Sequence, residues 1–339
     1  MGGGMELFDL KVEPSDLHPG FKRLLDPNLA AERAVLSAWA SKFHDRDKKF
    51  VKEFQTTFES SLWELYLHAV LKELRLGIDF THHAPDFLVT NPCCFTMEAT
   101  IAAPPLGGAP AIGTGVPEIP ADFNEFNREA TLRACNAISS KIKRYRQHYS
   151  TLDHVKDRPF VLALAPFDRP LAFLEYDRPI QAALYGRHID EERTMAEGLS
   201  TVIEREIVAV SKRPGVDVPV GLFCSDVCKE ISAVVYSAVA GWGKVRALAD
   251  SPDQASTYTT LHESTSSPEV RRARKRDYSE HLLDGLHVLH NPFATHPLSV
   301  DVFKHPSVSQ ERMERDGSHH RIREEGFLMT RQINSVMPV

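Results

Sequence analysis

The sequence lacks any apolar run near the roughly 18 uninterrupted residues that a membrane helix needs. Its first residues also lack the charged segment followed by an apolar stretch that marks a secretory signal. Nothing else directs the chain out of the cytosol, so we expect a cytoplasmic protein that does not enter a membrane. With 339 residues, 42% of them hydrophobic, the chain is long enough for one large or two ordinary domains.

Cysteine is scarce, and there is no excess of positive charge. The five cysteines are odd in number and scattered, which argues against a disulfide framework and a four-cysteine zinc site. The net charge of -6 gives no overall attraction to nucleic acid, so any such binding requires a local basic surface. No Walker A loop, dinucleotide glycine fingerprint or Gly-x-Ser-x-Gly elbow supports an ATPase, a dehydrogenase or a serine hydrolase.

The first half of the chain has clear periodic patterns. Apolar residues at steps of three and four predict a helix between residues 47 and 76, and Gly77 stands where a helix usually ends. Short apolar segments and one alternating segment then predict strands. The expected order is a helix at 47–76, strands at 78–80, 87–89 and 94–101, a Gly/Pro-rich functional loop at 102–120, a helix at 126–149 and a buried strand at 159–165.

The second half has weaker signals. Its short apolar runs do not settle the type of element, because buried strands and short helices share this pattern. Residues 250–275 are rich in Ser, Thr and Pro, so we expect a linker, and the highly charged tail from His305 gives no expectation of regular structure. The remaining expectations are a short helix at 180–184, strands at 201–210 and 218–223, and a strand or helix at 230–240.

Two acids stand on the predicted hairpin. Asp86 opens one strand, and Glu98 lies twelve positions later on the polar face of the next. Thr100 shares that face, because alternate side chains of a strand point the same way. Carboxylate oxygens are the ligands that Mg²⁺ and Mn²⁺ prefer, so Asp86 and Glu98 are candidate metal ligands, with Thr100 as a further position facing the same ion.

The segment Pro85-Asp86, followed by Glu98-Ala99-Thr100 within this order of elements, resembles the PD-(D/E)xK nuclease superfamily. The resemblance covers about residues 50–165. It implies an α/β fold with a restriction-endonuclease-like three-layer core, a mixed central sheet in the order αβββαβ, and a C-terminal α+β extension. The expected division is an N-terminal extension at 1–46, a nuclease-like domain at 47–240 and a partly irregular extension at 241–339.

The family lysine would stand where this chain has Thr100. The closer resemblance is to uncharacterised bacterial proteins with a Trp-Glu-Leu helix segment like Trp63-Glu64-Leu65, a Glu-Ala-Thr strand motif, and the lysine in the following helix. That resemblance implies Lys141 as the catalytic lysine, with Lys143 as the alternative. It also implies an acid on the first helix, for which Glu64 is favoured and Glu59 stays open.

The resemblance implies a metal-dependent nuclease that hydrolyses phosphodiester bonds, with DNA favoured over RNA. Mg²⁺ or Mn²⁺ would be held by Asp86 and Glu98, and Glu64 and Lys141 would complete the catalytic set. The alternative is an inactive scaffold of the same fold that binds nucleic acid or protein, since Thr100 replaces the usual lysine. A smaller phosphate ester is a third substrate class, and the sequence leaves a homodimer open.

Other polar groups have simpler explanations. His82-His83 are neighbours on an extended segment and point to opposite faces, which does not suit a shared metal. The histidines between His287 and His296 lack a zinc-ligand context. The basic run from Arg271 to Arg276 is typical of a solvated surface, with phosphate binding as the functional alternative.

Overall fold

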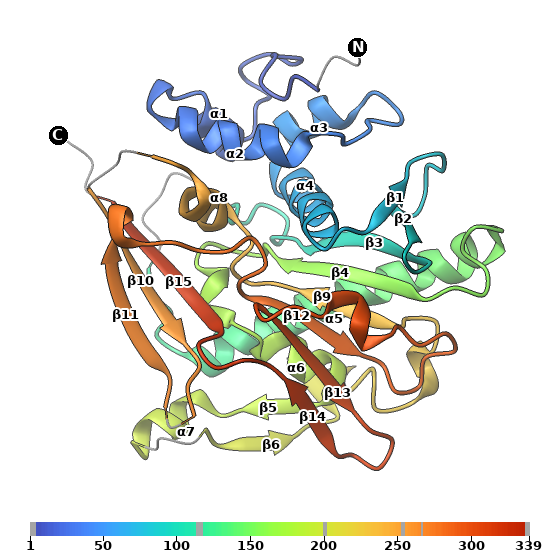
Figure 1. The fold of residues 1–339 in the computed structure, drawn as a ribbon. Coiled ribbons are helices and arrows are strands. Elements are labelled where there is room, and N and C mark those ends of the chain that lie inside the picture. The colour runs from blue at the N-terminus through green and yellow to red at the C-terminus, as the bar shows by residue number, and fades with distance from the viewer. Residues whose placement is uncertain (1–4, 113–117, 199–201, 252–254, 266, 336–339) are drawn as a thin grey trace.

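A large mixed sheet forms the centre of the fold (Figure 1). The computed structural model of the chain describes residues 5–112, 118–198, 202–251, 255–265 and 267–335. Eight strands lie side by side in the order β1-β2-β3-β4-β9-β12-β13-β14. Their bounds are β1 (Gly77–Asp79), β2 (Phe87–Asn91), β3 (Phe95–Ala102), β4 (Phe160–Pro166), β9 (Ala233–Tyr236), β12 (Leu286–His290), β13 (Val308–Met313) and β14 (His319–Ile322).

The main sheet contains both parallel and antiparallel pairs of strands. β3, β4 and β9 run parallel to one another, whereas β1, β2 and β3 are joined antiparallel. Every residue of β4 is buried, as expected for a parallel strand covered on both faces. β12 pairs antiparallel with β9 and parallel with β13, and β14 closes the sheet antiparallel to β13. The chain is therefore a mixed α/β protein, as the sequence predicts.

Helices cover both faces of the sheet (Figure 1). On one face Phe95 and Met97 of β3 join an apolar cluster with α4, and on the other face Leu162 and Leu164 of β4 pack with α5 and α6. The helices of the first face are α1 (Pro19–Leu24), α2 (Ala30–Ala40), α3 (Phe50–Thr56) and α4 (Phe58–Glu73), those of the second are α5 (Phe123–Gln147) and α6 (Arg178–Tyr185), and the remaining short ones are α7 (Glu191–Ala196) and α8 (Trp242–Leu248).

The predicted elements of the first half are confirmed. The region 47–76 divides into α3 and α4, and α5 and β4 follow at the expected places. Asp122 caps α5, because its Oδ1 accepts a hydrogen bond of 2.8 Å from the backbone N–H of Glu125. Of the predicted loop at 102–120, residues 113–117 lie outside the described part of the chain. The core on the α4 side draws residues from 1–46, 47–240 and 241–339 alike, from Leu7 to Val308.

The prediction of a linker at residues 250–275 was wrong. β10 (Ser256–His262) and β11 (Glu269–Arg274) pair with β15 (Leu328–Ser335) in a second, three-stranded antiparallel sheet. The tail also supplies β13 and β14 to the main sheet. β10 and β15 lie far apart in sequence, so local composition does not reveal their pairing.

Between α6 and β9 the chain forms small hairpins. β5 (Arg187–Ile189) pairs with β6 (Glu204–Glu206), and β7 (Ala209–Arg213) pairs with β8 (Val216–Pro219). The predicted strands at 201–210 and 218–223 are thus found in part, residue 201 lying outside the described ranges, and β9 settles residues 230–240 as a strand. Among the described helices none has the length and apolar character to cross a bilayer.

Candidate active site

The β2–β3 hairpin brings the two predicted acids to one place. The register pairs Phe87 with Met97, so the residue before β2 lies beside the middle of β3. Oδ2 of Asp86 accepts a hydrogen bond of 2.7 Å from the backbone N–H of Ala99, the neighbour of Glu98. The predicted hairpin is therefore present, and it sets Asp86 next to Glu98.

Glu98 is the buried member of the site. Only 2% of its surface is exposed, and its Oε1 lies 2.6 Å from Nζ of Lys141 on α5. Nη1 of Arg144 lies 3.8 Å from the same oxygen. The other oxygen, Oε2, is buried and makes no close hydrogen bond in the described part of the protein, although the Tyr149 hydroxyl is near enough to this carboxylate to interact with it. A buried carboxylate oxygen without a close hydrogen bond is costly, and a cation bound there would relieve that cost.

Asp86 and Glu64 are half-buried acids beside Glu98. Burial and the charge of Glu98 raise the pKa of Asp86 to about 7, against the opposing hydrogen bond from Ala99. Burial, followed by the charge of Asp86, raises the pKa of Glu64 well above its usual range. Carboxylates that oppose one another's ionisation are characteristic of catalytic and metal sites.

Of the two helix acids, Glu64 belongs to this site. Glu59 lies elsewhere, with Oε2 at 3.0 Å from Nε2 of His18 and Oε1 accepting a hydrogen bond of 3.3 Å from the backbone N–H of Ile112. The charges acting on Glu64 include those of both Asp86 and Glu98. The open choice between the two is thus decided by position, because α4 turns Glu64 toward the hairpin.

The two candidate lysines and Thr100 also differ in where they lie relative to Glu98. Thr100 lies on the face of β3 that carries Glu98 and is paired in register with Leu164 of β4. Lys141 reaches Glu98 from α5, whereas Lys143 is exposed and lines a groove next to the site. The single lysine paired with the buried acid in the described structure is therefore Lys141.

Two further residues of the site come from α5 and the segment after it. The guanidinium of Arg144 lies over the ring of Tyr149, 5.2 Å from its centroid. Burial and the nearby charge of Glu98 raise the pKa of the Tyr149 hydroxyl. The basic segment around Lys141 was visible in the sequence, but nothing there singled out Arg144 or Tyr149 as neighbours of Glu98.

Arg46 is a site residue that the sequence did not indicate. Its Nη1 donates hydrogen bonds to the backbone oxygens of His82 and Pro85, at 2.5 and 3.3 Å, and so holds the loop that leads into β2. Its charge also acts to lower the pKa values of Asp86 and Glu64. Arg46 ends the segment expected to be an N-terminal extension, which is why the sequence patterns placed it outside the site.

The donor set fits a hard divalent cation. Asp86 and Glu98 offer oxygen ligands, and Glu64 adds a carboxylate that their charges affect, although these three acids are not a group of three whose ligand atoms lie within 4.8 Å of one another in the described structure. Mg²⁺ and Mn²⁺ are bound through such oxygens, commonly with water completing the coordination. Oε2 of Glu98, buried without a close hydrogen bond, is the observation in the described structure that accords best with a cation.

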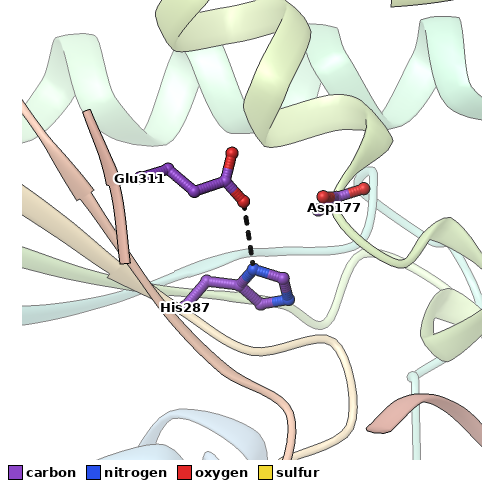
Figure 2. Close-up of side chains that lie close together, drawn as sticks. All are labelled: Asp177, His287 and Glu311. Carbon is purple, nitrogen blue, oxygen red and sulfur yellow. Dashed lines mark ion pairs between the residues drawn. The ribbon is translucent and has the colours of Figure 1, made fainter. Parts of the chain in front are cut away.

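A second group of potential ligands lies elsewhere in the sheet (Figure 2). Asp177 before α6, His287 on β12 and Glu311 on β13 are buried, and their ligand atoms lie within 4.8 Å of one another. It is the one group of three such residues as close as this in the described ranges. Nδ1 of His287 is 3.7 Å from Oε1 of Glu311.

Basic side chains already surround the Glu311 carboxylate of this second group. Guanidinium nitrogens of Arg321 and Arg323 lie 3.3 and 3.2 Å from the Glu311 carboxylate, and Nε2 of His319 lies 3.2 Å away. Against the effect of burial, hydrogen bonds with His287 and His319 hold the pKa of Glu311 well below its usual range. The Glu311 carboxylate has three basic side chains within 3.3 Å, against one within that distance of Glu98, so this group is better described as a buried ion network than as a metal site.

The other sequence patterns do not gather around an ion. His290 is hydrogen-bonded to Gln310 at 2.9 Å, and Nδ2 of Asn291 donates to backbone oxygens. His82 stacks on His154, their ring centroids 3.7 Å apart. The run from Arg271 to Arg276 covers most of the exposed edge strand β11 and the start of the turn that follows it.

No protein-family model matches this chain, and no curated protein or solved structure is similar to it. The fold and the site therefore describe this chain as a mixed α/β protein in which carboxylates and a lysine lie close together at the central sheet.

Proposed function

We propose that this chain is a metal-dependent nuclease of the PD-(D/E)xK type, acting on DNA in preference to RNA. The observation that carries the proposal is the ion pair between Lys141 and Glu98, with Asp86 bound to the next backbone amide. A carboxylate pair and an adjacent ammonium group are the parts that phosphodiester hydrolysis requires. The order α4, β1, β2, β3, α5, β4 supports a restriction-endonuclease-like core.

Asp86 and Glu98 would hold Mg²⁺ or Mn²⁺, and the bound ion would supply Lewis acidity and a water of lowered pKa. Lys141 is placed to orient the attacking water and to stabilise charge on the phosphate. Glu64 adds negative charge next to Asp86 and would increase the affinity for the cation. Arg144, 3.8 Å from Glu98, places a second positive charge at the edge of the site.

The direct test uses Asp86→Ala and Glu98→Ala proteins in a cleavage assay on plasmid DNA with Mg²⁺ or Mn²⁺. We expect both to lose metal-dependent cleavage by at least about 10³-fold, whereas Asp153→Ala, which alters a fully exposed side chain, retains wild-type activity. Mn²⁺ should also raise the Tm of the wild-type protein and of Asp153→Ala but not of the two site variants.

The second candidate is a scaffold of the same fold that binds without cutting. Thr100 at the family lysine position favours it. A wild-type protein whose Tm is unaffected by Mn²⁺ and which leaves DNA intact, yet binds it, would establish this alternative. Cleavage that persists in both Asp86→Ala and Glu98→Ala would reject the proposed site altogether.

A further inference from the structure

An open groove runs beside the candidate site. Its volume is about 790 Å³, and it lies along the C-terminal end of α5 and the turn that follows. None of its lining residues, all within the described ranges, carries a carboxylate. The lining residues that matter here are Ala84, Lys143, Arg144, Gln147, His148 and Tyr149.

The groove adjoins the carboxylates. Ala84 stands two residues before Asp86, and Tyr149 is close enough to Glu98 for the charge of that acid to affect its pKa. Arg144 lines the groove and also lies 3.8 Å from Oε1 of Glu98. A chain lying in the groove would therefore pass directly beside the proposed hydrolytic centre.

The charge of the groove is of one sign. Basic residues near the end of a helix stabilise the helix dipole, which by itself accounts for a lysine or arginine in this place. The helix dipole does not explain why the basic residues of α5 point in different directions. Arg146 turns away from the groove and pairs with Glu230 at 2.5 Å, whereas Lys143 and Arg144 line the groove. A concave basic surface without acids suits a polyanion.

The lining offers little to an unpaired base. Of its two aromatic rings, that of Tyr149 is only 2% exposed and lies under the Arg144 guanidinium, which leaves the exposed imidazole of His148 as the one accessible ring. Stacking of bases requires an accessible aromatic face, whereas Lys and Arg bind phosphates irrespective of sequence. The chemistry of the groove therefore favours the backbone of a nucleic acid over its bases.

Resting on the proposed function, we propose that this groove binds the sugar–phosphate backbone next to the phosphodiester that is hydrolysed, with Lys143 and Arg144 as phosphate contacts. The substrate is then a polymer and not a small phosphate ester, and binding in the groove does not depend on base sequence. Lys143 acts in affinity, whereas Lys141 acts at the reacting phosphate.

The test measures binding of the full-length chain to fluorescein-labelled 20-base-pair DNA duplexes by anisotropy, in EDTA so that no cleavage occurs. Lys143→Gln should weaken binding about three- to tenfold and lower the slope of log K against log salt by about 1. Arg146→Gln, which removes a charge from the same helix outside the groove, should bind within about twofold of wild type. Two duplexes of unrelated sequence should bind alike.

Activity assays separate this inference from the proposed function. With Mn²⁺, Lys143→Gln should raise KM for polymeric DNA, whereas Arg146→Gln should leave both KM for DNA and hydrolysis of bis(4-nitrophenyl) phosphate within about twofold of wild type. If DNA binding depends on Lys143 but the protein never cleaves DNA, the proposed role of the groove is supported and the proposed nuclease activity is rejected. Equal DNA binding by wild type and Lys143→Gln at every salt concentration would overturn the groove even if cleavage is found, and so would a strong preference for one duplex sequence.

Discussion

Nζ of Lys141 lies 2.6 Å from Oε1 of Glu98, although the lysine stands on α5 and the glutamate 43 positions earlier on β3. The pair joins a helix to a central strand across one face of the sheet. Thr100, two residues after Glu98 on the same strand face, occupies the position from which a lysine would reach the same point. The ammonium group thus arrives from a neighbouring element instead of from the strand itself.

Exchange of the two positions tests whether the ammonium group is what matters. Lys141→Met should lower metal-dependent DNA cleavage by about 10²- to 10³-fold, because it removes a positive charge placed at the reacting phosphate. Adding Thr100→Lys to that variant should recover at least about tenfold, since position 100 faces the same site. The rates are compared in single-turnover cleavage assays.

The Thr100→Lys substitution alone, in the wild-type background, is the control for the exchange. It should bring no more than a small change, because Lys141 already pairs with Glu98. A Lys141→Met protein that cleaves at the wild-type rate would contradict the assigned role.

The two acids of α4 should differ in their effect on catalysis. Glu64→Gln should lower cleavage by about 10-fold or more, because the group lies within the field of Asp86 and Glu98. Glu59→Gln should leave the rate within about twofold, because Glu59 is engaged with His18 and Ile112. Initial rates at several Mn²⁺ concentrations measure both effects, and a larger loss in Glu59→Gln would reverse the assignment.

Removal of the Asp86 charge should stabilise the metal-free protein. The pKa of Asp86 is raised to about 7 from an ordinary value of 3.8, so between these pH values the folded protein holds a proton that the unfolded chain has lost. The contribution of Asp86 to the free energy of unfolding therefore falls as pH rises through this window. Above about pH 7 the side chain is ionised in both states, and the full cost of its buried charge is present. Asp86→Asn carries no such penalty, and its amide oxygen still accepts from the Ala99 N–H.

Urea unfolding in EDTA measures this difference. At pH 8 we expect Asp86→Asn to exceed wild type by about 1–2 kcal/mol, and at pH 4 the two should be equal. A variant less stable than wild type at pH 8 would show that the Asp86 charge is compensated without a metal.

The buried ion network should matter for stability and not for metal binding. Glu311→Ala leaves the guanidiniums of Arg321 and Arg323 without their buried counter-charge and should cost about 3–5 kcal/mol. Glu269→Ala, which breaks an exposed ion pair with Arg271, should leave the urea midpoint close to that of wild type. Urea denaturation compares them. Mn²⁺-induced stabilisation that disappears in Asp177→Ala would instead identify this network as a metal site.

The patterns that predicted correctly are local ones. The alternation of residues 94–101 predicts β3, and the absence of Gly and Pro in α5 together with the Asp122 cap accounts for its length. The hairpin and the strand face bring Asp86 and Glu98 together on sequence grounds alone, because period-2 geometry and a short turn leave few alternatives. The three-stranded sheet of the second half escaped prediction because its central strand, β10, pairs with β15, which lies far away in sequence.

The sequence by itself determined the order of elements around the site and the pair Asp86 and Glu98, since both follow from local periodicity. Only the tertiary structure decided which of Lys141 and Lys143, and which of Glu64 and Glu59, lies near Asp86 and Glu98. Those choices depend on how α4 and α5 are rotated against the sheet, and that rotation is fixed by the packing of the two apolar clusters on its faces.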